Sequence, residues 1–316
     1  MMEHQLAGTR MRFKTVAFAW LILLVMGASW GLSFSLARLI ASRGVHPLGI
    51  TFWEAAIAAL LLIFAMVVRG ERISLTPSLL WFCALTGLVG MVIPATLFFY
   101  AAAHVPAGVL SLSLAVVPIM TFVASVLLGL DRFALGRMAG VLLGVAAIML
   151  LITPADSLPD PAQLPWVFVA LLASSCYAVF NILFAMFLPR GKSLLLLTCG
   201  MFSTASLATA PVLIALDSFV PFSWPWGALE WSLVALGLIN AVAYTLYFIL
   251  IETAGPVFTS LTTNAVTLFG ILWGIMIFNE RNSVWIWLSL LTMMAALLLV
   301  SPRGTRSGWT AATRGE

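Results

Sequence analysis

Residues 47–68 read PLGITFWEAAIAALLLIFAMVV, and Glu54 is the only charged residue in this stretch. An α-helix rises about 1.5 Å per residue, so about 20 apolar residues cross a hydrocarbon core that is about 30 Å thick. The stretch lacks the period-2 alternation of a barrel strand, and lipid cannot satisfy an unpaired backbone. It is therefore predicted to be a transmembrane helix with one acidic side chain inside it.

The whole chain has a composition close to that of this stretch. Of its 316 residues, 63% are hydrophobic and 8% are charged, and the formal net charge is +4. A soluble globular domain carries about 45–50% apolar and about 25% charged residues. The composition excludes soluble, disordered, collagen-like, disulfide-stapled and DNA-binding proteins, and it leaves an integral membrane protein. The three cysteines, Cys83, Cys176 and Cys199, lie in apolar runs, which is typical of buried thiols and not of a disulfide or metal site.

Ten apolar segments are long enough to span a membrane, and charged or Pro-rich turns separate most of them. The predicted fold class is therefore all-α integral membrane, with ten transmembrane helices. The turns at 102–106 and 250–256 are the shortest. The helices are predicted at 16–37, 47–68, 78–102, 106–129, 134–152, 165–188, 193–216, 229–250, 256–278 and 283–301.

The basic residues predict which face of the membrane each turn occupies. With the N-terminus in the cytoplasm, 12 of the 15 Lys and Arg residues lie inside, and Arg38, Arg43 and Arg281 lie outside. The positive-inside rule thus predicts a cytoplasmic N-terminal segment at 1–15 and a cytoplasmic C-terminal tail at 302–316. The first span is too long for the apolar region of a signal peptide and is predicted to be retained. The basic residues form no patch with aromatics, so no nucleic-acid partner is predicted.

The two halves of the chain are related to each other. Residues 96–132 align with residues 245–281 without a gap, and this alignment pairs Asp131 with Glu280 at the ends of the fourth and ninth segments. Each half holds five segments, and an odd number makes the second half enter the membrane from the opposite side. We therefore predict two inverted five-helix repeats, which are typical of secondary transporters with a site near the midplane. A duplicated scaffold without transport is the alternative.

Several motifs together resemble a known family. Trp30-Gly31-x-x-Phe34 lies in the first segment, Pro118 lies in the fourth, and an acidic residue ends the fourth and lies just after the ninth. In this order the motifs resemble the drug/metabolite transporter superfamily, and its EamA type most closely, over essentially the whole chain. The resemblance implies EamA-like repeats at 16–152 and 165–301. It also implies a bacterial inner-membrane transporter that exports small metabolites, often amino acids.

Three positions depart from the pattern of that family. Trp53-Glu54 stands where the family often has an arginine in the second helix, Thr267 stands where the second half would have a proline, and Leu130 instead of glycine precedes Asp131. The predicted fold is unaffected by these departures. An anion-binding role for the missing arginine does not transfer to this chain.

Glu54 is the most informative single residue. If its helix begins near Pro47, the side chain lies about 10 Å along the helix and clear of the lipid headgroups. A charge at a helix centre costs about 2.5–3.5 kcal/mol on insertion scales, and such residues usually face a water-filled cavity. Glu54 is therefore a candidate to bind a substrate amine or to exchange a proton. The alternative is a structural hydrogen bond to another helix, for example to Arg38.

Polar and aromatic side chains recur at helical spacing in four other segments. Asn240, Tyr244 and Tyr247 follow i, i+4, i+7, and so do Ser260, Asn264 and Thr267. These faces can line a pocket, whereas interhelical packing is the alternative, because small and hydroxyl residues commonly join membrane helices. The candidate substrate-binding residues are Glu54, Trp30, Ser33, Tyr177, Asn181, Asn240, Tyr244 and Asn264.

No enzyme is predicted, because the three histidines lie in helix ends or turns and the chain has no His-Glu-x-x-His or Walker motif. We predict no catalytic residue, cofactor or metal. Asp131 and Glu280 are expected to form surface ion pairs with the adjacent Arg132 and Arg281, or caps on the next helix.

The predicted function is a secondary transporter that exports small, amino acid-like metabolites by alternating access. Its partners are the substrate and the lipid bilayer, with protons and the oligomeric state left open. The alternatives are an uncoupled facilitator and a lipid-handling or scaffold protein. A transporter predicts a closed central pocket, whereas a lipid handler predicts a groove open to the bilayer.

Overall fold

A computed structural model describes residues 2–71, 76–154, 158, 160–189, 191–259 and 261–300; within these ranges, the side chains of residues 2–16, 248 and 251–258 are left out. The regular structure of the described residues is helical throughout. Eight of the described helical segments are long and apolar enough to cross a membrane, and two further apolar helices have 17 residues each. The protein is therefore a multi-pass membrane protein. The predicted C-terminal tail at 302–316 lies outside the described residues.

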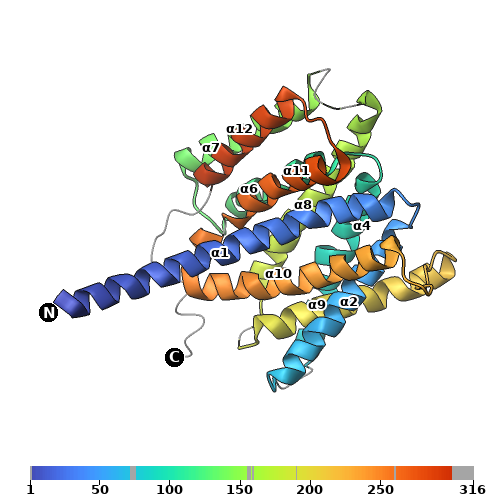
Figure 1. Cartoon of the computed structure of the whole chain (residues 1–316), viewed down its shortest axis with the longest axis horizontal. Helices are drawn as coiled ribbons and strands as arrows, with labels where there is room; N and C mark the ends of the chain where they lie inside the picture. The colour runs from blue at the N-terminus through green and yellow to red at the C-terminus, as the bar shows by residue number, and fades with distance from the viewer. Residues whose placement is uncertain are drawn as a thin grey trace.

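The first half of the chain forms seven α-helices and one π-helical turn. The predicted helix at 47–68 is found with these same bounds. The first helix begins well before the predicted residue 16, so the N-terminal segment continues it, and Figure 1 shows it extending beyond the bundle. The elements are α1 (Met2–Ala41), α2 (Pro47–Val68), α3 (Pro77–Gly87), η1 (Leu88–Val92), α4 (Ile93–Ala102), α5 (Ala107–Leu114), α6 (Val117–Leu127) and α7 (Leu135–Ile152).

The second half forms five α-helices after a short 3-10 turn. Most of their bounds lie within one residue of the prediction, because the thickness of the bilayer fixes how long each apolar run must be. The elements are η2 (Pro161–Gln163), α8 (Leu164–Phe187), α9 (Leu194–Ala215), α10 (Ala228–Thr259), α11 (Thr262–Phe278) and α12 (Val284–Val300).

Prolines interrupt two of the predicted helices. The span predicted at 106–129 is found at Ala107–Leu127, but its helix is interrupted, because α5 ends at Leu114 and α6 begins at Val117, with Pro118 in its first turn. Proline has no N–H and therefore cannot donate to the carbonyl four residues earlier. The segment at 78–102 likewise contains the π-helical turn η1 just before Pro94.

The break predicted at 250–256 is also wrong. α10 runs without interruption to Thr259, and α11 begins only at Thr262. Membrane helices tolerate glycine and proline, and Gly255-Pro256 lies within the continuous helix α10. Glu252 therefore lies in a helix and not in a turn.

The helices of the two halves are interleaved. In Figure 1, α1 lies between α10 and α11, α7 lies beside α12, and α2 lies against α9. The pair α2 and α9 is antiparallel. At one end Trp53 Nε1 donates to the carbonyl of Val220 over 2.9 Å, and at the other Ser193 Oγ donates to Glu71 Oε2 over 2.6 Å.

In two other pairs of helices, one from each half, the start of one helix lies at the same end of the molecule as the end of the other. Arg137, in the first turn of α7, donates from Nε to the carbonyl of Val300, the last residue of α12, over 2.9 Å. Trp166, in the first turn of α8, stacks on His104 with ring centroids 3.7 Å apart. His104 and the turn after α1 line one pocket, so α8 begins at the face of the molecule where α1 ends.

Glycines bring α1 and α11 into close contact. A Cβ at Gly31 would lie 2.7 Å from the Cβ of Phe269 and 2.9 Å from the backbone nitrogen of Gly270. A backbone atom cannot move aside as a flexible side chain can, so only glycine fits at position 31. This contact fixes the position of α1, which carries Trp30 and Ser33.

Gly31→Ala is expected to lower the free energy of unfolding by about 1–3 kcal/mol, the usual cost of overpacking. Gly136→Ala in α7 is the matched control, because nothing lies within 4 Å of a Cβ at that position. Thermal denaturation in detergent measures both changes. Equal stability of the two variants would show that α1 and α11 do not need this close approach.

Candidate functional site

A cavity of about 540 Å³ lies between the two halves of the chain. Its wall takes residues from α1, α2 and α6 of the first half and from α8, α10 and α11 of the second. Seven of the eight candidate residues lie on this wall, although they come from four separate helices. They are Trp30, Ser33, Glu54, Tyr177, Asn181, Asn240 and Tyr244.

A chain of hydrogen bonds joins three helices on the wall of this cavity. Trp30 Nε1 of α1 donates to Asn240 Oδ1 of α10 over 3.0 Å, and Asn240 Nδ2 donates to Glu54 Oε1 of α2 over 2.5 Å. Asn240 Nδ2 also lies 3.2 Å from the carbonyl of Leu236. The amide therefore holds the carboxyl group of Glu54 at a fixed place in the cavity wall.

The second carboxyl oxygen of Glu54 is the exceptional atom of the site. Glu54 is 6% exposed, and among the described residues no group forms a hydrogen bond with its Oε2. A buried polar atom without a partner is costly, so this oxygen is a place where a ligand donor would be favourable. The alternative in which Glu54 binds Arg38 is wrong, because Arg38 pairs with Glu280.

Aromatic rings surround this group. Trp30 and Tyr244 meet edge to face with centroids 5.4 Å apart, and Tyr247 lies 6.3 Å from Trp30. Tyr244 also packs edge to face against Phe202, with ring centroids 5.4 Å apart. This contact helps to hold Tyr244 in the wall. Such rings offer a ligand both apolar contact and the negative face of a π system.

Neutral polar groups line the part of the wall formed by α6 and α8. Asn181 Nδ2 donates to Thr121 Oγ1 over 3.2 Å, and Ser125 lies one turn further along α6. Thr121 and Ser125 were not among the residues predicted from the sequence. Their spacing of three and seven residues from Pro118 places them on the same helix face, and this signal could have found them.

Asn264 is the candidate residue that does not line the cavity. Its side chain is 8% exposed and its Oδ1 has no hydrogen-bond partner among the described residues. The rotation of α11 explains its place, because Gly270 packs on Ser111, whose Oγ donates to the carbonyl of Thr267 over 3.2 Å. This rotation turns Thr263 toward the cavity instead. Ser260, predicted on the same face, lies outside the described residues.

An exposed ion pair marks one end of the cavity. Arg137 donates from Nη1 to Asp131 Oδ2 over 2.7 Å, and its guanidinium lies 4.0 Å above the ring of Phe122. The predicted pairing of Asp131 with the side chain of Arg132 is not found, although the backbone N–H of Arg132 donates to Asp131 Oδ1. The guanidinium of Arg137 therefore contacts Asp131 and Phe122 of the protein itself.

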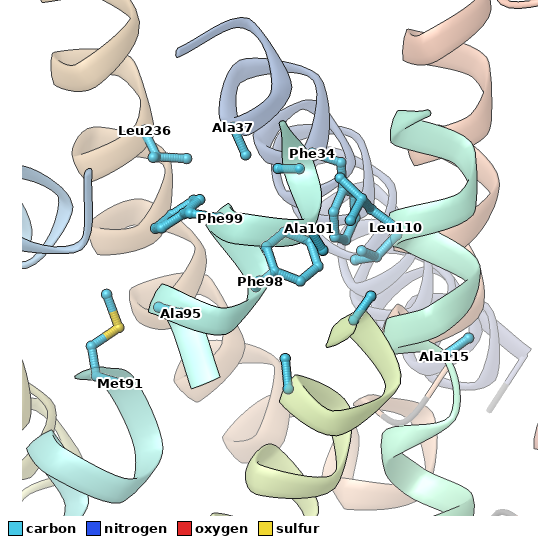
Figure 2. Close-up of a cluster of buried hydrophobic side chains, with 14 of the residues drawn as sticks. Phe34, Ala37, Met91, Ala95, Phe98, Phe99, Ala101, Leu110, Ala115 and Leu236 are labelled. Atoms are coloured by element: carbon cyan, nitrogen blue, oxygen red, sulfur yellow. The ribbon is translucent and has the colours of Figure 1, made fainter. Parts of the chain in front are cut away.

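Phe99 lies at the opposite end, between the cavity and a second pocket. It lines the central cavity and also a second pocket of about 510 Å³, which the turns around His46, His104 and Asp217 form. Figure 2 shows Phe98 directed toward Phe34, with ring centroids 5.6 Å apart, whereas Phe99 projects from the opposite side of α4. One phenyl ring is therefore common to the walls of both spaces.

Glu280 holds three helices together near this end. It pairs with Arg38 of α1, and it accepts from the backbone N–H of Ala107 over 2.8 Å and of Gly108 over 3.4 Å. A carboxylate at a helix N-terminus is favourable because of the helix dipole, and here it caps α5. The predicted surface pair with Arg281 is wrong, because the left-handed turn at Asn279, with φ of 52°, directs Glu280 inward.

Comparison with known proteins assigns the first half of the chain. Residues 17–153 match the model of the EamA-like transporter family. These residues belong to that family. The EamA-like family is part of the drug/metabolite transporter superfamily, so the predicted resemblance is confirmed. A match to a family of membrane transporters implies a small-molecule substrate and a lipid bilayer as partners.

A solved structure extends the comparison to the whole fold. It is described only as the crystal structure of a protein, and it is 20% identical to this chain with a TM-score of 0.62. The match covers 90% of this chain and 97% of the other. At this level of identity the likeness establishes the fold alone. No protein with a curated description matches this chain significantly.

Proposed function

We propose that this EamA-family protein is a secondary transporter that exports small, amino acid-like metabolites across the bacterial inner membrane by alternating access. One observation carries the proposal. The Trp30–Asn240–Glu54 chain holds a buried carboxyl group, with one unpartnered oxygen, in a cavity between the two halves. A scaffold has no need of such a group, whereas a transporter needs one to hold its substrate midway across.

The helix contacts support ten spans in two inverted repeats at 16–152 and 165–301. In the first half, α1 contacts α10 and α11; in the second, its counterpart α8 contacts α4 and both α5 and α6. The counterparts α2 and α9 contact each other, and so do α7 and α12. If each helix is replaced by its counterpart in the other half, the same set of helix contacts results. The opposed helix ends described above support the inverted sense.

The distribution of charge supports a cytoplasmic mouth for the cavity. Arg137 and Arg132 lie at the mouth, whereas Arg38 and Arg281 lie at the opposite end. Under the positive-inside rule, the mouth and both termini then face the cytoplasm. A cavity open to the cytoplasm is the state in which an exporter collects its substrate.

Reconstitution into proteoliposomes tests the proposed function. We expect loaded small amines or amino acids to exchange across the membrane only when the protein is present. Imposing a pH gradient then separates proton-coupled export from an uncoupled facilitator, because only the former would accumulate substrate against its gradient. Failure to move any hydrophilic solute would favour the lipid-handling alternative.

Alternating access requires the Phe99 partition to open on the side away from the mouth. We expect Phe99→Ala to raise the labelling of a cysteine at position 33 from that side at least about tenfold, which corresponds to a barrier lowered by about 1.4 kcal/mol. The measurement uses a membrane-impermeant thiol reagent on a protein without Cys83, Cys176 and Cys199. Phe98→Ala is the control, because Phe98 lines the central cavity only. Equal labelling in the two variants would remove Phe99 from the path.

A further inference from the structure

We propose that the central cavity selects amines that have an apolar or aromatic body and no free carboxylate. This inference rests on the proposed function and narrows its substrate class. It depends on the charges of the cavity wall, on the unpartnered oxygen of Glu54 and on the aromatic rings around it.

The wall offers a ligand one unpaired charged group. Among the described residues that line the cavity, the charged ones are Glu54, Asp131 and Arg137. Arg137 is bound to Asp131, to the carbonyl of Val300 and to the ring of Phe122. Glu54 accepts one hydrogen bond, from the neutral amide of Asn240, and its Oε2 has no partner among the described residues. The deep part of the cavity is therefore a site for a cation.

The aromatic rings of the wall indicate that the ligand has an apolar or aromatic body. Trp30 is joined to this carboxyl group through Asn240, and the rings of Tyr244 and Tyr247 pack against Trp30 on the same wall. An ammonium group gains from the face of an aromatic ring, and an apolar body gains from the large contact area of such rings. The volume of about 540 Å³ lies within the usual range for a small-molecule site.

A zwitterionic amino acid fits this wall less well. Its ammonium group can meet Glu54, but its carboxylate would then face neutral groups such as Asn181 and Thr121, which already bind each other over 3.2 Å. A buried charge is costly unless it is paired, and the cation among the described lining residues, Arg137, is already paired with Asp131. Removing or masking the carboxylate of the ligand eliminates this cost.

A matched series of three ligands tests the inference on the purified protein. Phenethylamine, phenylalaninamide and phenylalanine share the ring and the amine, and only phenylalanine has a free carboxylate. Binding is measured by calorimetry in detergent, with no need for transport. We expect the first two to bind at least about tenfold more tightly than phenylalanine. We also expect Glu54→Gln to weaken both amines at least about tenfold, whereas Glu71→Gln, the same change outside the cavity, leaves them unchanged.

The outcomes separate the inference from the proposed function. Equal or tighter binding of phenylalanine, or no binding of either amine, would overturn the inference. If both amines bind through Glu54 but neither crosses the membrane of a proteoliposome, the site is supported and transport is refuted. If phenylalanine is transported as well as the amines, transport is supported and the selection by charge is refuted.

Discussion

Glu54→Gln is expected to reduce transport of a cationic substrate by about two orders of magnitude, the loss that follows when one member of a buried charge pair is removed. Glutamine keeps a carbonyl oxygen that can accept from Asn240 Nδ2, so the hydrogen-bond chain to Trp30 can persist. What the variant loses is the ability to place a negative charge beside a bound cation. The reduction should therefore appear in flux and in affinity, while the thermal stability changes little.

The measurement is initial flux in proteoliposomes at equal protein density, with Glu71→Gln as the matched control. Glu71 accepts from Ser193 and does not line the cavity, so this variant should transport at the rate of the unaltered protein. A Glu54→Gln protein with full flux would assign Glu54 a structural role only, as a hydrogen-bond acceptor between α2 and α10.

Glu280→Gln is expected to lower the free energy of unfolding by about 3 kcal/mol, because it removes one partner of a buried ion pair. The side chain of Glu280 is 6% exposed and that of Arg38 is 30% exposed, so the guanidinium loses its counter-charge in a largely enclosed place. The cap on α5 also weakens, since a neutral amide accepts less strongly than a carboxylate from Ala107 and Gly108. Chemical or thermal denaturation in detergent measures the change.

Asp131→Asn provides the contrasting case. It breaks the pair with Arg137, but Asp131 is 39% exposed, and exposed pairs contribute about 0–1 kcal/mol. In a double variant, Arg38→Gln should cost less in the Glu280→Gln background than alone, because the two side chains interact. Additive losses, or equal losses at Asp131 and Glu280, would contradict the assigned contact.

The spans were predictable because the bilayer constrains them directly. A run such as 47–68 must be apolar, helical and long enough to cross, and each of these requirements is visible in the sequence. The interruptions were not predictable in the same way. Pro118 lies at a break between α5 and α6, whereas the Gly255-Pro256 pair does not break α10, and spacing along the chain does not distinguish the two cases.

The candidate site was predictable to the extent that polar residues are costly in lipid. Glu54 and Asn240 stand out in apolar helices, and such residues usually face one another or a cavity. Phe99 carried no such signal, because a phenylalanine in a membrane helix is ordinary. The partner of Glu280 was also hidden, since Arg38 lies 242 positions away and the adjacent Arg281 offered a simpler pair. Contacts of this kind depend on the tertiary fold and not on spacing along the chain.

The opposed insertion of the two halves is the claim on which alternating access depends, and cysteine labelling tests it most directly. One cysteine is placed at Ser42, after the first helix of the first half, and another at Lys192, after the first helix of the second, in a protein without its native cysteines. A membrane-impermeant reagent applied from one side should label only position 42 when that side is the outer face, and only position 192 when it is the inner face. Labelling of both positions from the same side would contradict the inverted arrangement and the transport cycle built on it.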